Sequence, residues 1–165
     1  MQLAMRKTTR RLLLAGALAT VAACGFTPVY GPGGDGLMLR SAVRVAEPST
    51  DFDFAFTRQF EARLGRPTAA RYDLTYVIVT EETGLAIDGS NNITRFDLEG
   101  RMTWTLTAEG GVNPALRGIE TAFTAYSATG STISTLESER DAETRLAAIL
   151  ADKVVTRLLS EADGL

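Results

Sequence analysis

The segment Ile93-Thr-Arg-Phe-Asp-Leu-Glu-Gly-Arg-Met-Thr-Trp-Thr-Leu-Thr107 decides the fold of this chain. Its apolar side chains recur at alternate positions: Phe96, Leu98, Met102, Trp104 and Leu106. Charged and hydroxyl side chains fill most of the other positions: Arg95, Asp97, Glu99, Arg101, Thr103 and Thr105. Because successive side chains of a strand point to opposite faces, this alternation predicts a long strand with one apolar and one polar face.

Three further strands are predicted around this segment. Alternation of apolar and polar residues marks Leu37–Ala46, Arg71–Val79 and about Leu116–Ser127. On the last of these strands, Ile119 and Phe123 are expected on the apolar side. The predicted sheet therefore has four strands, each with one face to bury.

Two helices are predicted to cover that face. Phenylalanines at four-residue spacing lie within Phe52–Leu64, after N-cap candidates at positions 48–51 and before a stop at Gly65. A second helix is expected to begin at a capping box of Ser134 and Glu137 and to run toward the C-terminus. The order is strand, helix, three strands, helix. This predicts an α+β two-layer sandwich, with two helices on one face of a four-stranded, mostly antiparallel or mixed sheet.

The opposite face of the predicted sheet carries charge. It is expected to present Arg40, Arg44, Arg71, Asp73, Arg95, Asp97, Glu99 and Arg101. Plain solvation explains such a face, since a one-sided sheet turns polar residues to water. A second interpretation is a surface for a partner or an anionic ligand, because the planar arginine fork binds phosphate or carboxylate with two hydrogen bonds. Arg95 and Arg101 are the first candidates for that role.

The aromatic residues of the strands have two interpretations. Tyr72, Tyr76, Phe96 and Trp104 could line a pocket for an acyl chain. Strict strand spacing on the apolar face favours a place in the core beneath the helices.

The N-terminal segment has the features of an export signal. Four basic residues precede an uncharged run that ends in Val-Ala-Ala-Cys24. We expect cleavage between Ala23 and Cys24 and acylation of the Cys24 sulfur by diacylglycerol, with palmitate as a further acyl group. A transmembrane helix is disfavoured, because a run of about 12 residues is too short for a bilayer of roughly 30 Å. For Cys24, a buried structural thiol is the other alternative to an acylated cysteine. The predicted organisation is a signal peptide (1–23), a tether rich in Gly and Pro (24–36) and one domain (37–165).

Composition excludes several classes of function. Without residues 1–23 the chain keeps 13 basic and 20 acidic residues, a balance that argues against binding nucleic acid. There is no His and only one Cys in the sequence, so histidine-based catalysis and an internal disulfide are excluded. We therefore predict no catalytic residue, no metal site, no cofactor and no enzymatic activity. A hydrolase using Asp97 and Glu99 is a weak alternative, since we expect those two carboxylates not to act as a pair.

Two motifs carry a resemblance to a known family. The residues from Cys24 read Cys-Gly-Phe-Thr-Pro-Val-Tyr-Gly, and positions 139–146 read Glu-Arg-Asp-Ala-Glu-Thr-Arg-Leu. Both resemble the LptE family of lipopolysaccharide-assembly lipoproteins, especially its alphaproteobacterial members. The resemblance implies two helices on one side of a four-stranded sheet.

The resemblance also implies a function and a location. Such a protein plugs the LptD barrel of the outer membrane, assists the assembly of that barrel and binds lipopolysaccharide. Gly25, which follows the acylated cysteine, favours the outer membrane. The candidate residues for contact with lipopolysaccharide or a partner are Arg95, Arg101, Arg40 and Arg44. The alternative is an auxiliary lipoprotein of a lipid-trafficking ABC transporter.

Overall fold

The computed structural model describes residues 31, 34, 36–87, 89 and 91–165, and the compact unit Asp35–Leu165 contains the sheet and the helices described below. The predicted signal peptide, Cys24 and most of the predicted tether lie outside the described residues. The elements follow one another in the order α2 (Gly36–Leu39), β1 (Val43–Val45), α3 (Asp51–Leu64), β2 (Tyr72–Ile87), β3 (Ile93–Ala108), β4 (Pro114–Ser127), α4 (Thr132–Ser160) and a short 3₁₀ helix, η1 (Ala162–Gly164).

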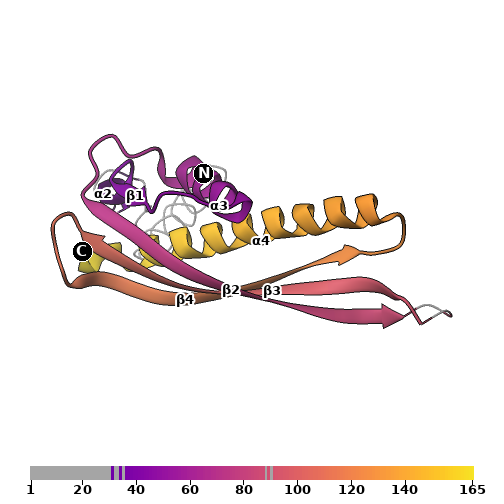
Figure 1. Cartoon of the computed structure of the whole chain (residues 1–165). Helices are drawn as coiled ribbons and strands as arrows, with labels where there is room; N and C mark the ends of the chain where they lie inside the picture. Colours follow the sequence, from indigo (N-terminus) through magenta and orange to yellow (C-terminus); the bar gives the residue numbers. More distant parts are fainter. Residues whose placement is uncertain (1–30, 32–33, 35, 88, 90) are drawn as a thin grey trace, which may run out of the picture. The chain divides into compact units, whose positions relative to one another are not determined.

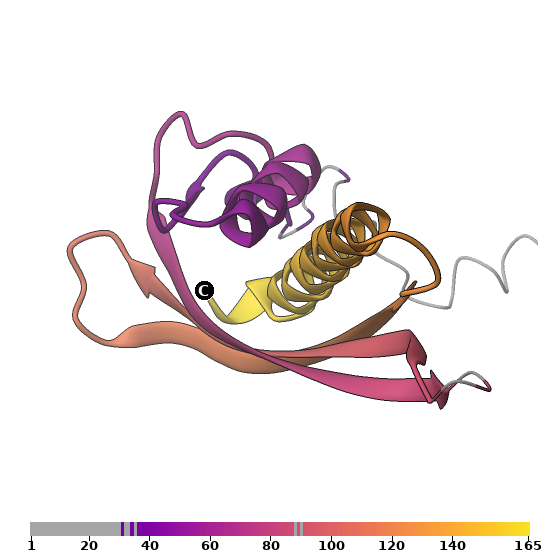
Figure 2. The same cartoon turned by 45° about the vertical axis from the view of Figure 1, so that its right-hand side comes forward.

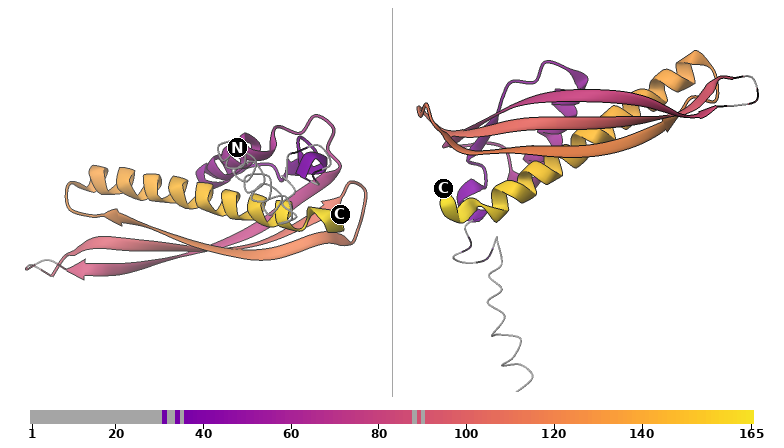
Figure 3. Two further views of the ribbon diagram at one scale, coloured as in Figure 1. Left: turned by 180° about the vertical axis from the view of Figure 1, so that it is seen from behind. Right: turned by 90° about the horizontal axis from the view of Figure 1, so that it is seen from below.

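The four strands form one mixed sheet in the order β1-β2-β3-β4. β1 runs parallel to β2, whereas β2, β3 and β4 are antiparallel neighbours. Both long helices, α3 and α4, lie on the same face of this sheet (Figures 1 and 2). Seen from behind and from below, the β2–β3 hairpin extends well beyond α3 (Figure 3). This architecture confirms the predicted α+β fold with two helices on one sheet face.

The helix α3 forms where its sequence predicts it. Thr50 is the N-cap, and its hydroxyl accepts a hydrogen bond from the Asp53 N–H at 3.1 Å. The Asp53 carboxylate accepts from the Thr50 N–H in return, which completes a capping box. The helix ends at Gly65, whose φ of 83° is a conformation that favours glycine. The caps thus satisfy the free Asp53 N–H at the start of the helix and the Glu61 carbonyl, which accepts from the Gly65 N–H, at its end.

The strand predicted at Leu37–Ala46 is wrong over its first half. Gly36–Leu39 forms the helix α2, and only Val43–Val45 pairs with β2. The interruption lies at Ser41, which adopts a left-handed φ of 55° and donates its N–H to the Leu64 carbonyl at 2.7 Å. The backbone at Ser41 is therefore bound to the end of α3, and it cannot pair with β2 before Val43.

The predicted orientation of the fourth strand is also wrong. Ile119 and Phe123 lie on the face away from the helices and are 52% and 74% exposed. The inward positions of β4 hold Ala122, Thr124 and Tyr126, all of them buried. The physical reason is the close approach of α4, which leaves little room for large side chains at Ala122 and Thr124; Tyr126, nearer the end of the strand, reaches Glu82 with its hydroxyl. The helix α4 packs so tightly here that its own Ala142 carbonyl accepts a hydrogen bond from the Thr124 hydroxyl at 3.0 Å.

The start of α4 differs from its prediction. The N-cap is Ser131, whose extended backbone (φ −72°, ψ 158°) leads into the helix and whose hydroxyl accepts from the Ser134 N–H. Ser134 and Glu137 do not form the predicted capping box, because the helix already begins at Thr132. Glu137 instead forms an ion pair with Arg140, 2.8 Å apart.

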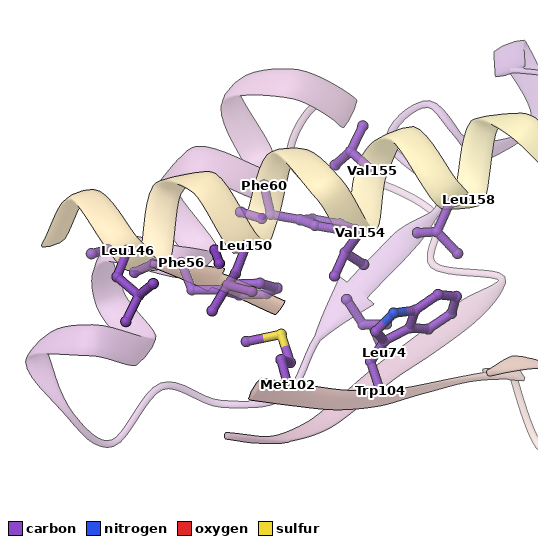
Figure 4. Close-up of a cluster of buried hydrophobic side chains, with 14 of the residues drawn as sticks. Phe56, Phe60, Leu74, Met102, Trp104, Leu146, Leu150, Val154, Val155 and Leu158 are labelled. Carbon is purple, nitrogen blue, oxygen red and sulfur yellow. The ribbon is translucent and has the colours of Figure 1, made fainter. Parts of the chain in front are cut away.

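The core lies between the sheet and the two helices. Figure 4 shows Trp104 and Met102 of β3 beneath α4, with Leu150, Val154 and Leu158 above them. These side chains are fully buried, as are Phe56 and Phe60 of α3. The aromatics Tyr72, Tyr76 and Phe96 pack against this cluster as partly buried neighbours. Thus the four aromatic residues of β2 and β3 belong to the core, as their spacing favours.

Candidate interaction surface

The outer face of the sheet is built in rows that cross β2, β3 and β4. Strand register places Thr103 between Val77 and Ile119, and places Arg101 between Val79 and Thr121 in the next row. Farther along, Glu99 lies between Glu81 and Phe123, Asp97 between Thr83 and Ala125, and Arg95 between Ala86 and Ser127. Since directly opposite residues share a face, each row is a set of neighbours.

This outer face is more apolar than the sequence predicts. Val77 and Val79 of β2 are 68% and 65% exposed; Val77 lies across β3 from Ile119, and Phe123 of β4 is in the row of Glu81 and Glu99. Single exposed apolar residues are ordinary, but four of them on one face of three strands form a patch. The face therefore mixes exposed apolar residues with charged ones, since Arg101 lies between Val79 and Thr121.

The acidic residues gather beyond this patch. Glu81 of β2 lies directly opposite Glu99 of β3, and Asp97 is the next outward residue of β3. The three line a shallow hollow of about 830 Å³ together with Phe123 and Lys153. Asp97 and Glu99 are thus on the same outer face, because residues i and i+2 of a strand share a face, so separation onto opposite faces does not keep these two carboxylates from acting as a pair.

The four candidate arginines do not form one cluster. Arg95 and Arg101 lie on the outer face of β3, and neither forms an ion pair with another described residue. Arg44, on β1, binds the carboxylates of Asp73 and Glu109 at 2.8 and 3.2 Å. The hydrogen bond and charge of Asp73 raise the pKa of Arg44 above its ordinary value. Its fork is therefore occupied by protein carboxylates.

Arg40 and Arg71 were predicted on the sheet face but lie outside the strands. Arg40 is an exposed residue of the turn after α2. Arg71 immediately precedes β2, and its guanidinium donates to the Met38 carbonyl. The break at Ser41 moves Arg40 off the sheet, so Arg95 and Arg101 remain as the candidates whose guanidinium groups are available on the outer face.

On the inner face, a carboxylate ties α3 to β2. The Tyr76 hydroxyl donates to the Asp53 carboxylate at 2.7 Å, and the same carboxylate accepts from Thr50 and from both donors of Ser49. Burial alone would raise the pKa of Asp53, but these hydrogen bonds outweigh it and lower that pKa to about 2. Burial and the neighbouring carboxylate raise the pKa of Tyr76. The spacing of Thr50 and Asp53 is that of a capping box, but nothing in the sequence predicts the hydrogen bond between Asp53 and Tyr76.

A second polar link joins β4 to β2 farther along the inner face. The Tyr126 hydroxyl donates to the Glu82 carboxylate at 2.9 Å, and burial and that carboxylate raise the pKa of Tyr126. Burial also raises the pKa of Glu143 on α4, with further contributions from Glu139 and Asp51. Acidic side chains therefore gather on both faces of the sheet around the second half of β2.

The described residues offer neither a metal site nor a membrane span. No group of three or more acidic or cysteine side chains within the described ranges is arranged to hold a metal ion. None of the helices in the described part of the chain is both long enough and apolar enough to cross a bilayer.

The fold is that of a group of bacterial lipoproteins of known structure. A lipoprotein from Caulobacter crescentus aligns with a TM-score of 0.65 and 16% identity, covering 79% of this chain and 97% of that one. Rare lipoprotein B from Shewanella oneidensis aligns with a TM-score of 0.54 and 9% identity, covering 72% of this chain and 92% of that one. A minor lipoprotein from Acinetobacter baumannii aligns with a TM-score of 0.54 and 14% identity, covering 73% of this chain and 90% of that one. At these identities the likeness establishes the fold alone.

Sequence comparison identifies the family. The model of the LptE family, described as lipopolysaccharide-assembly, matches residues 40–158. The chain belongs to the LptE family, a family of lipopolysaccharide assembly. No curated protein sequence matches the chain.

Proposed function

We propose that the chain is an outer-membrane lipoprotein that occupies the LptD barrel, assists its assembly and takes part in the transport of lipopolysaccharide, without enzymatic activity. The family match over residues 40–158 carries this proposal. We further propose that residues 1–23 are removed and that acylated Cys24 anchors the domain on the periplasmic side or in the barrel lumen. The Val-Ala-Ala-Cys motif supports this anchor.

The outer face of the sheet fits such a setting. The lumen of an outer-membrane barrel is polar and watery, and β3 presents charged and hydroxyl side chains on that face. Within it, we propose that Arg95 and Arg101 contact the phosphates of lipopolysaccharide, since neither forms an ion pair with another described residue.

A detergent pull-down of the full-length chain through its C-terminus tests the proposed partner and anchor together. We expect LptD among the captured proteins and a bait mass that includes the acyl groups at Cys24. Recovery of inner-membrane ABC-transporter subunits without LptD would favour the alternative function. Cys24→Ala is the control for the anchor, and we expect it to remove the acyl mass and to leave the helix and sheet signal in circular dichroism unchanged.

Charge reversal tests the arginines. The double variant Arg95→Glu/Arg101→Glu is expected to weaken binding of purified lipopolysaccharide by about tenfold or more. Arg117→Glu is the matched control, because Arg117 is opposite Thr105 on the same outer face but nearer the other end of β3. Equal losses in both variants would show a general charge effect and would contradict a specific role of Arg95 and Arg101.

A further inference from the structure

The two long edges of the sheet differ in how far their backbone groups are hydrogen-bonded. At the β4 edge, two cations of α4 bind backbone carbonyls: Lys153 Nζ donates to the Thr121 oxygen at 2.7 Å, and Arg145 donates to the Ala125 oxygen at 3.1 Å. Unpaired strand edges attract other strands, and charged side chains, lysine especially, commonly prevent this. The α4 helix thus closes the β4 edge.

The β2 edge is closed only at its beginning. On the β1 side, the Tyr72 N–H donates to Ala42 and the Leu74 carbonyl accepts from Ala46. Because backbone groups alternate between the two sides of a strand, Ile78, Thr80 and Glu82 direct their N–H and C=O groups to this same side. No backbone hydrogen bond joins those groups to another residue in the described part of the chain.

This free edge is long and accessible. All six residues from Thr80 to Leu85 are exposed, and the register with β3 is regular up to Gly84. Six residues of strand extend roughly 20 Å, which is the length of an ordinary strand. The edge contains neither proline nor lysine, the two residues that most often block strand addition.

The charge around the edge selects what can pair with it. Glu81 and Glu82 lie at its centre and point to opposite faces. On the outer face Glu81 is opposite Glu99, and on the inner face Glu82 interacts electrostatically with Glu143 of α4. A second copy of this chain, paired antiparallel through the middle of the edge, would bring these carboxylates against their own counterparts, which is destabilising.

We propose that the free edge of β2, from Ile78 to Leu85, pairs with an extended segment of another protein that carries two consecutive basic residues. Neighbouring residues of the added strand point to opposite faces, so one basic side chain reaches Glu81 and the next reaches Glu82. Backbone hydrogen bonds to Ile78, Thr80 and Glu82 supply affinity, and the two ion pairs supply selectivity. This site is independent of the barrel function proposed above, because it is defined by the edge alone.

The test uses the full-length, isotope-labelled chain in detergent micelles and an acetylated probe peptide of alternating Val and Thr with Lys-Arg at its centre. Amide hydrogen exchange followed by NMR reports individual N–H groups. We expect the peptide to slow exchange at Ile78, Thr80 and Glu82 by about tenfold or more, while Val79 and Glu81, which already face β3, change little. Absence of binding, or binding without this alternating pattern, would overturn the proposal.

Two controls separate the edge from its charge. Thr80→Pro removes an outward N–H and keeps the ladder to β3, so we expect peptide affinity to fall about tenfold or more. Thr121→Pro, the same change at the β4 edge, should leave the affinity unchanged. A peptide with Glu-Asp at its centre should bind about tenfold more weakly than the basic one, and equal binding would overturn the charge assignment.

A charge-reversed variant keeps the proposal testable if Thr80→Pro does not fold. Glu81→Lys/Glu82→Lys changes two exposed residues, with loss of the Tyr126–Glu82 hydrogen bond, and should reverse the preference between the two peptides. An unchanged preference would contradict pairing at this edge. Protection of the same amides that rises with protein concentration, without peptide, would show self-pairing and overturn the proposed occupant.

Discussion

Both halves of β2 pair with β3, with regular register as far as Gly84, but they lie in different surroundings. In the near half, Tyr72–Val79, the inward side chains are apolar or aromatic, and α3 packs above them. In the far half, Thr80–Ile87, the inward positions hold Thr80, Glu82 and Gly84, and the described side chains are exposed. The difference teaches that pairing with β3 extends the strand, whereas burial decides how much each half stabilises the protein.

The largest expected effect comes from two leucines on this one strand. Leu74 in the near half is fully buried, and Leu85 in the far half is 54% exposed. We expect Leu74→Ala to lower the free energy of unfolding by about 2–5 kcal/mol, because it removes buried methyl groups and leaves a cavity. Leu85→Ala should change it by no more than about 0.5 kcal/mol. Urea unfolding followed by circular dichroism measures both.

The same experiment shows whether the halves are separable. If the Leu85→Ala variant loses as much stability as Leu74→Ala, the far half is buried in solution and the contrast fails. A change in the slope of the urea transition would instead indicate a change in the surface exposed on unfolding.

Glycines give the next largest contrast. A Cβ on Gly118, in the row of Trp104, would lie 2.6 Å from the buried indole ring, and that ring cannot move without disturbing the core. We expect Gly118→Ala to cost about 1–3 kcal/mol. A Cβ on Gly84, in the far half of β2, would lie 2.8 Å from Cδ1 of Ile93, the far end of an exposed side chain that can rotate away.

We therefore expect Gly84→Ala to cost less than about 0.5 kcal/mol, because the strand also gains from losing a glycine. Thermal unfolding of the two variants provides the measurement. Equal losses would mean that Ile93 is as constrained as Trp104, and would extend the packed region to the hairpin end.

The near half of β2 could be predicted from the sequence and the far half could not. Alternation predicts Arg71–Val79, and the strand continues to Ile87 because register with β3 imposes it where the inward positions are no longer apolar. The same limit explains β4, whose more hydrophobic face turns outward. Ala122 and Thr124 on its inner face lie beneath α4 and must be small, a requirement of packing that no single-strand pattern contains.

The candidate surface was predictable only in part. Alternation predicts Arg95 and Arg101 on the outer face, and both lie on that face of β3 in the structure. The exposed Val77 and Val79 were not foreseen there, since polar residues at other outward positions gave the face its predicted character. Arg40 could not be placed, because a left-handed Ser41 and its bond to Leu64 are tertiary features.

The smallest predicted effect concerns pH and the link between α3 and the near half of β2. Asp53 has a folded-state pKa of about 2, below its ordinary value of 3.8, so it stabilises the folded state above about pH 4. That contribution is lost as the pH falls through the window from about 4 to 2. Because the carboxylate is partly solvated, we expect it to amount to about 1 kcal/mol.

Tyr76→Phe removes one of the hydrogen bonds that hold this carboxylate ionised. We expect the variant to lose about 1 kcal/mol at pH 7 and to show a flatter decline of stability between pH 4 and 2, measured by urea unfolding across that range. Tyr126→Phe is the matched control, since its partner Glu82 lies in the exposed far half and the change should cost less at pH 7. An unaltered acid slope in Tyr76→Phe would show that the capping bonds from Thr50 and Ser49 alone keep Asp53 ionised. Apolar packing, and not the Tyr76–Asp53 hydrogen bond, would then hold α3 against the near half of β2.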